Sequence, residues 1–328
     1  MTQDEPPVWV LAGHRTGDNN QLLRLAGELG LPFRTIELGY NGLHRLPPRL
    51  LGATVASLDG ESRNRVRPPW PKLVLGIGNR SVPAALAIRR MSGGTARLVR
   101  LGNPRLDPRN FDLVITTAQY SVPDAPNVLR LPVGISTAPR IEPSREESEW
   151  LARLPRPHRL LLVGGDTFMW RLTPDALRGA ASALRQKAGG SVIAVSSARS
   201  GKAVLDSIAA TLAQSDHALV WGRFPRYPVL LADADEIHVT ADSAAMISDS
   251  IATRKPVALI EPRMTLSGRF FYGLQRLGIP VPVRDVRRFW TQARDRRLAG
   301  TVERPVAGML DLDPLAEAVS AIRPLLGG

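Results

Sequence analysis

The sequence predicts an α/β fold with two domains, each built on a mainly parallel β-sheet. Short apolar runs recur along the whole chain with helix-period segments between them, which is typical of parallel strands covered by helices. At 328 residues the chain is long for a single core and suits two domains of ordinary size. A stretch rich in proline and charge, 137–159, separates two series of these runs and is a reasonable domain junction.

Each expected strand is an apolar run of five to seven residues bounded by turn residues. In the first half we expect strands over 8–13, 33–38, 72–78, 97–102, 112–117 and 128–133. In the second half we expect them over 159–165, 191–197, 218–222, 236–241, 256–262 and, more weakly, 281–285. Helices are expected over 19–29, 81–91, 173–187, 201–213, 243–252, 267–276 and 313–325. The predicted organisation is a first domain over 1–140, a linker over 141–157, a second domain over 158–310 and a C-terminal helix over 311–328, with a crossing back to the first domain as one option.

Composition excludes several classes of function. The chain has no cysteine, which excludes disulfides, zinc–thiolate sites, iron–sulfur clusters and cysteine nucleophiles. No apolar run approaches the ~20 residues of a membrane span, and the N-terminus lacks the basic-then-apolar pattern of a secretion signal. We therefore expect a cytoplasmic protein.

The net charge is +13, and the excess is almost entirely arginine. Arginine guanidinium groups suit phosphates and carboxylates, so the excess charge could serve to bind nucleotide diphosphates, an anionic membrane or nucleic acid. It could also reflect genome composition alone.

Five successive strand ends in the second half are polar or rich in glycine. Ligands of open α/β sheets bind beyond the carboxyl ends of the strands, so these ends predict a nucleotide-diphosphate site made of backbone amides, hydroxyls and an arginine. Small residues follow Ser243, so a ligand can approach the amides at that helix start. The candidate donor-binding residues are Gly164, Gly165, Asp166, Ser196, Arg199, Trp221, Tyr227, Asp242, Ser243 and Asp249. A solvated helix position explains Asp249 equally well.

The first half offers a candidate acceptor side in the loop after its first strand. Asp18 or His14 could act as a general base there, although a capped strand–helix turn explains the same residues. Arg80 begins a later helix and could hold an anion. The other acceptor-side candidates are Gly13, Asn19, Asn20 and Gln21. The preceding Gly76-Ile77-Gly78 does not complete a dinucleotide fingerprint, since position 81 is serine.

No metal site and no cofactor are expected, and any nucleotide-sugar would be a substrate. The five histidines are scattered and form no metal-ligand pattern. The segment 284–304 is dense in arginine, with Phe289 and Trp290 among them. It could contact an anionic membrane at the inner face of the cytoplasmic membrane, or form a solvated helix whose aromatics pack inward. Nucleic acid is not expected, because no recognised motif accompanies the arginines.

Several segments together resemble the mitochondrial-fission Elm family and its bacterial relatives, which look like GT-B glycosyltransferases. The matching segments are GDNNQ (17–21), RSVPAALAIRR (80–90), DPRNFDLV (107–114), LLVGGD (161–166) and VTADSAAMISDSIATRKPV (239–257). The strand end at Gly164-Gly165 is also similar, more distantly, to the donor half of the transferase that builds the peptidoglycan lipid intermediate.

The resemblance implies two Rossmann-like domains facing across a cleft, with a nucleotide-sugar donor held mainly by the second. It implies a metal-independent glycosyltransferase acting on a cell-envelope glycolipid or polysaccharide. The alternative that it implies is a non-catalytic recruitment protein of the mitochondrial-fission type. Asp249 stands where the family commonly has glutamate, and Gln119-Tyr120 where it tends to have His-Asp.

Overall fold

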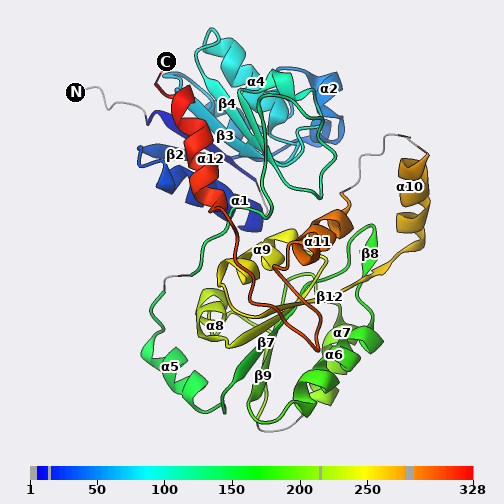
Figure 1. Ribbon diagram of the computed structural model, residues 1–328. Helices are drawn as coiled ribbons and strands as arrows, with labels where there is room; N and C mark the ends of the chain where they lie inside the picture. The colour runs from blue at the N-terminus through cyan, green and yellow to red at the C-terminus, as the bar shows by residue number, and fades with distance from the viewer. Residues whose placement is uncertain are drawn as a thin grey trace. The chain divides into compact units, whose positions relative to one another are not determined.

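The chain divides into two compact units. The computed structural model describes residues 6–13, 16–139, 141–213, 216–277, 279 and 284–327 (Figure 1). One unit contains Met1–Ser136 with Leu312–Gly328, and the other contains Thr137–Asp311. Helix α5 (Arg145–Ala152) lies in the stretch that we expected to be a linker, and it belongs to the second unit.

A six-stranded parallel sheet forms the centre of the first unit, with strand order β2-β1-β3-β4-β5-β6. Its strands are β1 (Val8–Ala12), β2 (Phe33–Glu37), β3 (Leu73–Ile77), β4 (Arg97–Leu101), β5 (Leu113–Thr116) and β6 (Val128–Arg130). Its helices are α1 (Thr16–Glu28), α2 (Pro48–Leu51), α3 (Gly60–Arg65), α4 (Val82–Met91) and α12 (Pro314–Ile322), with 3-10 turns η1 (Gly42–Arg45), η2 (Pro108–Asn110) and η3 (Arg323–Leu325).

The sheet of the first unit is covered on both faces. All five residues of β1 are buried, as expected for a central parallel strand. Val8 and Val10 pack with apolar residues of α1 and α12, while Trp9 and Leu11 pack on the other face with residues of α4. Side chains of a strand alternate between its faces, so both helical layers are needed, and the C-terminal helix α12 supplies part of one.

The second unit contains a five-stranded parallel sheet with the order β10-β9-β7-β11-β12. Its strands are β7 (His158–Val163), β9 (Ser191–Ser196), β10 (Ala218–Val220), β11 (Glu236–Thr240) and β12 (Val257–Ile260), and a small antiparallel pair is formed by β8 (Trp170–Arg171) and β13 (Arg263–Met264). Besides α5, its helices are α6 (Pro174–Gln186), α7 (Lys202–Thr211), α8 (Tyr227–Asp233), α9 (Ala244–Ala252), α10 (Leu266–Arg276) and α11 (Val286–Asp295).

In each sheet the strand order reverses beside the first strand. The chain runs from β7 outward through β9 to β10, then returns to the other side of β7 with β11 and β12. In the first unit the same reversal lies between β1 and β3. Ligands of doubly wound sheets bind at such reversals, outside the carboxyl ends of the strands. Two positions, one in each unit, are therefore the places to examine for a site.

The strands expected from the apolar runs are confirmed, apart from the weak one over 281–285. Residues 281–283 lie outside the described part of the chain, and Arg284 and Asp285 have no strand structure. Helix α1 begins at Thr16, three residues before the predicted start at 19. The β8–β13 pair was not predicted, because two residues are too few to show an alternating pattern. None of the described helices combines the length and apolar character that crossing a bilayer requires.

Candidate functional site

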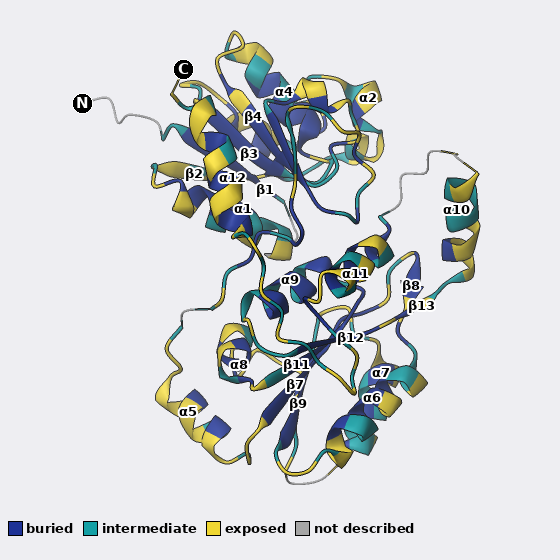
Figure 2. Ribbon diagram, in the orientation of Figure 1, coloured by how far each residue is buried: buried dark blue, intermediate teal, exposed yellow. Residues whose placement is uncertain are grey.

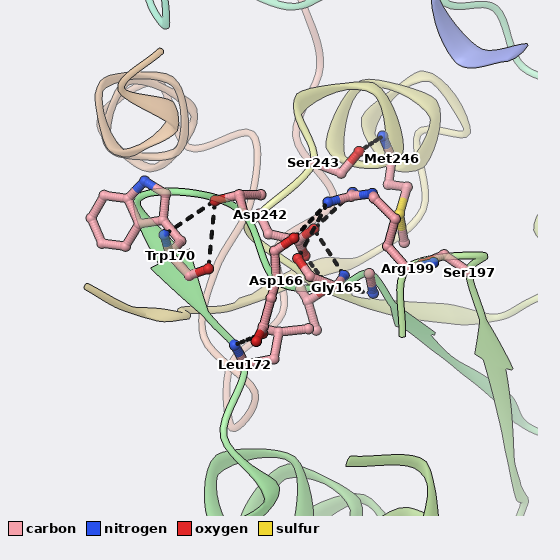
Figure 3. A network of polar contacts seen from close by, with 12 residues as sticks. Gly165, Asp166, Trp170, Leu172, Ser197, Arg199, Asp242, Ser243 and Met246 are labelled. Atoms are coloured by element: carbon pink, nitrogen blue, oxygen red, sulfur yellow. Dashed lines mark hydrogen bonds and ion pairs between the residues drawn. The ribbon is translucent and has the colours of Figure 1, made fainter. Parts of the chain in front are cut away.

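The carboxyl ends of β7 and β11 are joined by a buried polar network centred on Asp242 (Figure 3). The Asp242 carboxylate accepts hydrogen bonds from the Thr240 hydroxyl at 2.7 Å and from the Gly165 amide at 3.1 Å. The Gly164 amide in turn donates to the Thr240 hydroxyl at 2.8 Å. Because Asp242 is fully buried, its charge depends on these donors and on the arginine described next.

Arg199 is the cationic member of this network. Its Nη2 lies 3.0 Å from Oδ2 of Asp242, and its Nη1 donates to the Gly165 carbonyl at 3.3 Å. Nearly half of the side chain, 47%, remains exposed while its aspartate partner is buried. The guanidinium is thus anchored by Asp242 and Gly165 on a side chain that is still partly accessible to solvent, a geometry that suits the recognition of a phosphate.

Positions 164 and 165 require glycine, because Asp242 and Arg199 approach their backbone too closely for a side chain. A Cβ atom at Gly164 would lie 2.2 Å from Oδ1 of Asp242, and one at Gly165 would lie 2.0 Å from the Arg199 backbone oxygen. The loop after β9 is held against them, since the Ser200 hydroxyl lies within 2.8 Å of the Val163 and Gly164 carbonyl oxygens. The two glycines therefore let the three strand ends meet.

Helix α9 begins beside this network. Ser243 is its N-cap residue, and the Ser243 hydroxyl accepts from the Met246 amide at 3.4 Å. Ser243 directly follows Asp242 in the chain, so the positive end of the α9 dipole lies beside the network and adds to its positive potential. Asp249 lies farther along α9 and is partly buried.

The other donor-side candidates are spread along the same edge of the sheet. Asp166 is bound within the loop, where it accepts from the Leu172 amide at 2.9 Å and pairs with Arg171 at 3.4 Å. Ser196 ends β9 directly opposite Val163. Trp221 follows the edge strand β10 and is 37% exposed, and Tyr227 begins α8. The structure brings Gly164, Gly165, Arg199, Asp242 and Ser243 together. Asp166 joins them through its backbone carbonyl, which accepts from Nη1 of Arg199 at 3.5 Å.

Sequence reasoning missed Thr240 and Ser200, which hold the network together. Both stand at or just beyond a strand end, and the only signal was their position there, since hydroxyl residues at strand ends are common in ordinary turns.

In the first unit, Asn19 closes the loop after β1. Its side chain accepts from the Gly13 amide at 2.9 Å and donates to the Gly13 carbonyl at 2.7 Å. Asp18 lies in the first turn of α1, followed by Asn20 and Gln21 in the same helix, and His14 lies outside the described residues. Arg80 is exposed, in the turn before α4.

The aromatic residues of the arginine-rich segment 284–304 are not available to a membrane. Phe289 is fully buried and Trp290 is 4% exposed, packed against Trp170 with ring centroids 4.9 Å apart. Arg287 pairs with Asp285, and Arg294 pairs with Glu261. The reading in which the aromatics of this segment pack inward is therefore the one that the structure supports.

Two hollows of the described surface lie away from the Asp242 network. One, of about 340 Å³, lies between α6 and β12, and the other, of about 370 Å³, lies beside α2 and α4. Among the described residues, no group of three or more histidine, aspartate or glutamate side chains is arranged to hold a metal ion. The absence of a metal from the reaction stays a prediction.

Solved structures with similar folds cover nearly the whole chain. A candidate UDP-N-acetylglucosamine 2-epimerase from Listeria monocytogenes is 13% identical, with a TM-score of 0.54 over 98% of this chain and 96% of that one. Arabidopsis thaliana UGT89C1, solved in complex with UDP-L-rhamnose, is 12% identical, with a TM-score of 0.52 over 98% and 94%. These likenesses confirm the fold class: two Rossmann-like domains of the GT-B type.

Sequence comparison gives the family. An uncharacterized protein of Rickettsia prowazekii, RP120, is 29% identical over 109 residues, which cover 33% of this chain and 30% of that protein. The chain thus spans less than a third of that relative. The family described as mitochondrial fission ELM1 matches over residues 16–303. This match covers most of both units and includes the Asp242 network, and it confirms the resemblance seen in the sequence: the chain belongs to the mitochondrial fission ELM1 family.

Proposed function

We propose that the chain is a glycosyltransferase that holds the diphosphate of a nucleotide-sugar donor at the Asp242 network. The observation that carries the proposal is the half-exposed Arg199 side chain, whose guanidinium is anchored by buried Asp242, the residue just before the start of α9. It stands at the reversal of strand order, where ligands of such sheets bind. The GT-B fold, shared with a protein solved in complex with UDP-L-rhamnose, supports this choice of ligand.

In the proposed reaction the bond between the anomeric carbon and the diphosphate oxygen breaks, and a bond to an acceptor hydroxyl oxygen forms. The nucleoside diphosphate leaves with the electron pair, and the acceptor proton passes to a base. Arg199 and the α9 amides would stabilise the charge that develops on the leaving group, so the reaction needs no metal. Asp18 or His14 stays our candidate for the base, and an envelope glycolipid or polysaccharide our candidate for the acceptor.

Nucleotide binding tests the proposal through Arg199. We expect millimolar UDP, GDP, ADP, CDP or CMP to raise the melting temperature, because a ligand that binds only the folded state stabilises it. In Arg199→Ala the affinity for the effective nucleotide should fall about tenfold or more, since a hydrogen bond to a charged group contributes roughly 1.5–3 kcal/mol. Arg199→Lys should keep part of it.

Lys202→Ala is the matched control. Lys202 begins α7, close in sequence to Arg199, but its side chain is 87% exposed and pairs with Asp206 on the same helix. This variant should bind nucleotide as the wild type does. If none of the nucleotides shifts the melting temperature, or if Arg199→Ala binds them unchanged, the donor site is not where we place it.

A second candidate function is non-catalytic recruitment, and the family itself favours it. Nucleotide-sugar consumption in the presence of a lipid extract separates the two. A transferase should release nucleoside diphosphate together with a glycosylated product, and Arg199→Ala should release neither. If Arg199→Ala transfers no sugar but still fulfils the role of the protein in the cell, the recruitment function is favoured.

A further inference from the structure

We propose that the first unit binds a phosphoryl group over the loop Gly78–Ser81, where the start of α4 and the side chains of Arg80 and Arg100 supply positive charge. This site lies in a different unit from the Asp242 network and does not depend on the function proposed for it.

Arg100 is a buried cation with unused hydrogen-bond donors. It lies on β4 and is 1% exposed. Its Nη2 donates to the Gly78 carbonyl, whereas Nε and Nη1 are buried and have no hydrogen-bond partner in the described structure. Buried donors are rarely left unpaired, and such a group often marks a ligand that the structure lacks.

No counter-charge accompanies this guanidinium. Among the described residues, no carboxylate forms an ion pair with Arg100. The nearby acid is Tyr40, whose pKa is raised by burial in spite of Arg100 and Arg80, so its phenol stays neutral at pH 7. Burial lowers the pKa of Arg100 to about 10, which still leaves it charged. An uncompensated buried charge is costly, and an anion would remove that cost.

The guanidinium lies against the start of α4. A Cβ atom at Gly76 would be 2.1 Å from Nη1 of Arg100 and 3.6 Å from the Ser81 hydroxyl. Both groups therefore lie close to the position that a side chain at residue 76 would occupy. Ser81 is the N-cap residue of this 10-residue helix but makes no side-chain capping bond. A cation beside the positive end of a helix is repelled. A bound anion at this place would balance both positive charges.

The loop lies between this buried charge and the surface. Gly78 and Asn79 are partly buried, and Arg80 is exposed. The loop follows β3, whose neighbour β1 marks the reversal of strand order in this sheet. Two arginines and a helix start suit a doubly charged phosphoryl group better than a single carboxylate.

Titration calorimetry with inorganic phosphate tests the site. The wild type should bind phosphate, and Arg100→Met and Arg80→Met should each weaken binding by about tenfold or more. Nucleotide binding at Arg199 should be unchanged in both variants. Arg97→Met is the matched control, because Arg97 lies on the same strand, is 51% exposed and pairs with Asp112. This control should bind phosphate normally.

Three outcomes would overturn the site. Phosphate affinity could be unchanged in Arg100→Met and Arg80→Met, or it could fall only in Arg199→Ala, which would assign the phosphate to the other unit. A lower melting temperature of Arg100→Met with unchanged phosphate affinity would make Arg100 a structural brace. If Arg100→Met does not fold, the phosphate affinity of Arg80→Met tests the site, because the Arg80 side chain is exposed. Comparing glycerol 3-phosphate with a short-chain phosphatidic acid then tells whether the natural group belongs to a soluble molecule or to a lipid.

A separate observation concerns α10, and we infer that this helix docks on an anionic membrane surface. Gly268 is its only buried residue among the described ones, and the helix stands apart from the sheet of its unit (Figures 1 and 2). One face is attached to the unit: Phe271 packs on Phe168 with centroids 5.3 Å apart, and Arg287 lies 4.0 Å from the centre of the Tyr272 ring.

The opposite face of α10 is an apolar stripe open to solvent. Leu266, Phe270 and Leu277 are 81%, 64% and 78% exposed, and Leu274 lies between them at helical spacing. A helix of 11 residues is marginal in water without packing, so an exposed stripe of this kind indicates a partner surface.

The charge around the stripe selects the partner. Between Glu261 and Asp285 the sequence has no acidic residue, and it has four arginines: Arg263, Arg269, Arg276 and Arg284. A basic helix with leucine and phenylalanine on one face matches the interface of a bilayer that contains anionic lipid. The membrane contact is thus assigned to α10 and not to the aromatics of 284–304.

Flotation with vesicles tests this contact. The full chain should float with vesicles of phosphatidylglycerol and phosphatidylcholine and not with phosphatidylcholine alone, and added salt should weaken the binding. Phe270→Ser with Leu277→Ser should reduce binding by roughly tenfold or more, and Arg269→Gln with Arg276→Gln should remove its salt dependence. Leu50→Ser with Met309→Ser is the control, because these side chains are 70% and 73% exposed elsewhere.

Binding that is equal in all variants, or absent from both kinds of vesicle, would overturn the assignment. A dimer that forms in solution and is lost in Phe270→Ser with Leu277→Ser would instead make a second copy the partner of α10.

Discussion

Asp242→Ala should destabilise the second unit by about 3–5 kcal/mol, the usual cost of removing one partner from a buried charged network. The Thr240 hydroxyl and the Gly165 amide would lose their acceptor inside the protein, and Arg199 would lose its anchor. Since native domains are stable by only about 5–15 kcal/mol, this loss is a large fraction of the stability of the unit. Thermal and urea unfolding followed by circular dichroism measure the effect.

Asp175→Ala is the control for this prediction. Asp175 lies in the first turn of α6 of the same unit, is 85% exposed and pairs with Arg178 at 3.5 Å. Its loss should change stability by no more than about 0.5 kcal/mol. If Asp242→Ala proves as mild as Asp175→Ala, the network does not hold the strand ends together, and Asp242 would be free to act on a ligand directly.

Gly165→Ala and Gly179→Ala should have opposite effects. A methyl group at Gly165 would lie 2.0 Å from the Arg199 backbone oxygen, so the loop must move, at a cost of about 1–3 kcal/mol. Gly179 is an exposed residue in the middle of α6, and a methyl group added there would have nothing within 4 Å. There alanine should stabilise by about 0.5–1 kcal/mol through its better helix propensity.

The same pair separates stability from binding. Gly165→Ala should also lose nucleotide binding, because the shifted loop carries Arg199 away from the start of α9. Gly179→Ala should bind nucleotide as the wild type does. A Gly165→Ala protein with full stability and full nucleotide affinity would show that the strand ends can separate without harm to the site.

Much of the fold could be predicted because its strands and helices follow from residue patterns that are local in the sequence. The buried strands β1 and β7 are continuous apolar runs, and α6 has the helical spacing of leucine and alanine that packs on a sheet. The strand ends at Gly164 and Asp242 could be marked as a candidate site, since the order of elements predicts a parallel sheet and its carboxyl ends carry ligands.

The roles within the site could not be predicted. Asp242 was expected to contact the donor, yet the structure shows its carboxylate fully buried and bonded to Thr240, Gly165 and Arg199. Which polar residue at a strand end faces solvent depends on the neighbouring strands, which are distant in sequence. The arginine segment 284–304 shows the same limit: its pattern allows a membrane face, but Trp290 packs on Trp170, 120 positions away.

The sequence by itself determined the α/β class, the two sheets with their strands, and the family; it also predicts the edge of the second sheet as the place of a ligand site. Those properties follow from periodicity, turn residues and motif order, which are local along the chain. Only the tertiary structure decided that Asp242 anchors Arg199, that Arg100 is buried with two donors unpaired among the described residues, and that the apolar stripe of α10 faces solvent. These properties depend on contacts between distant segments, because burial and pairing arise only when strands and helices have packed together.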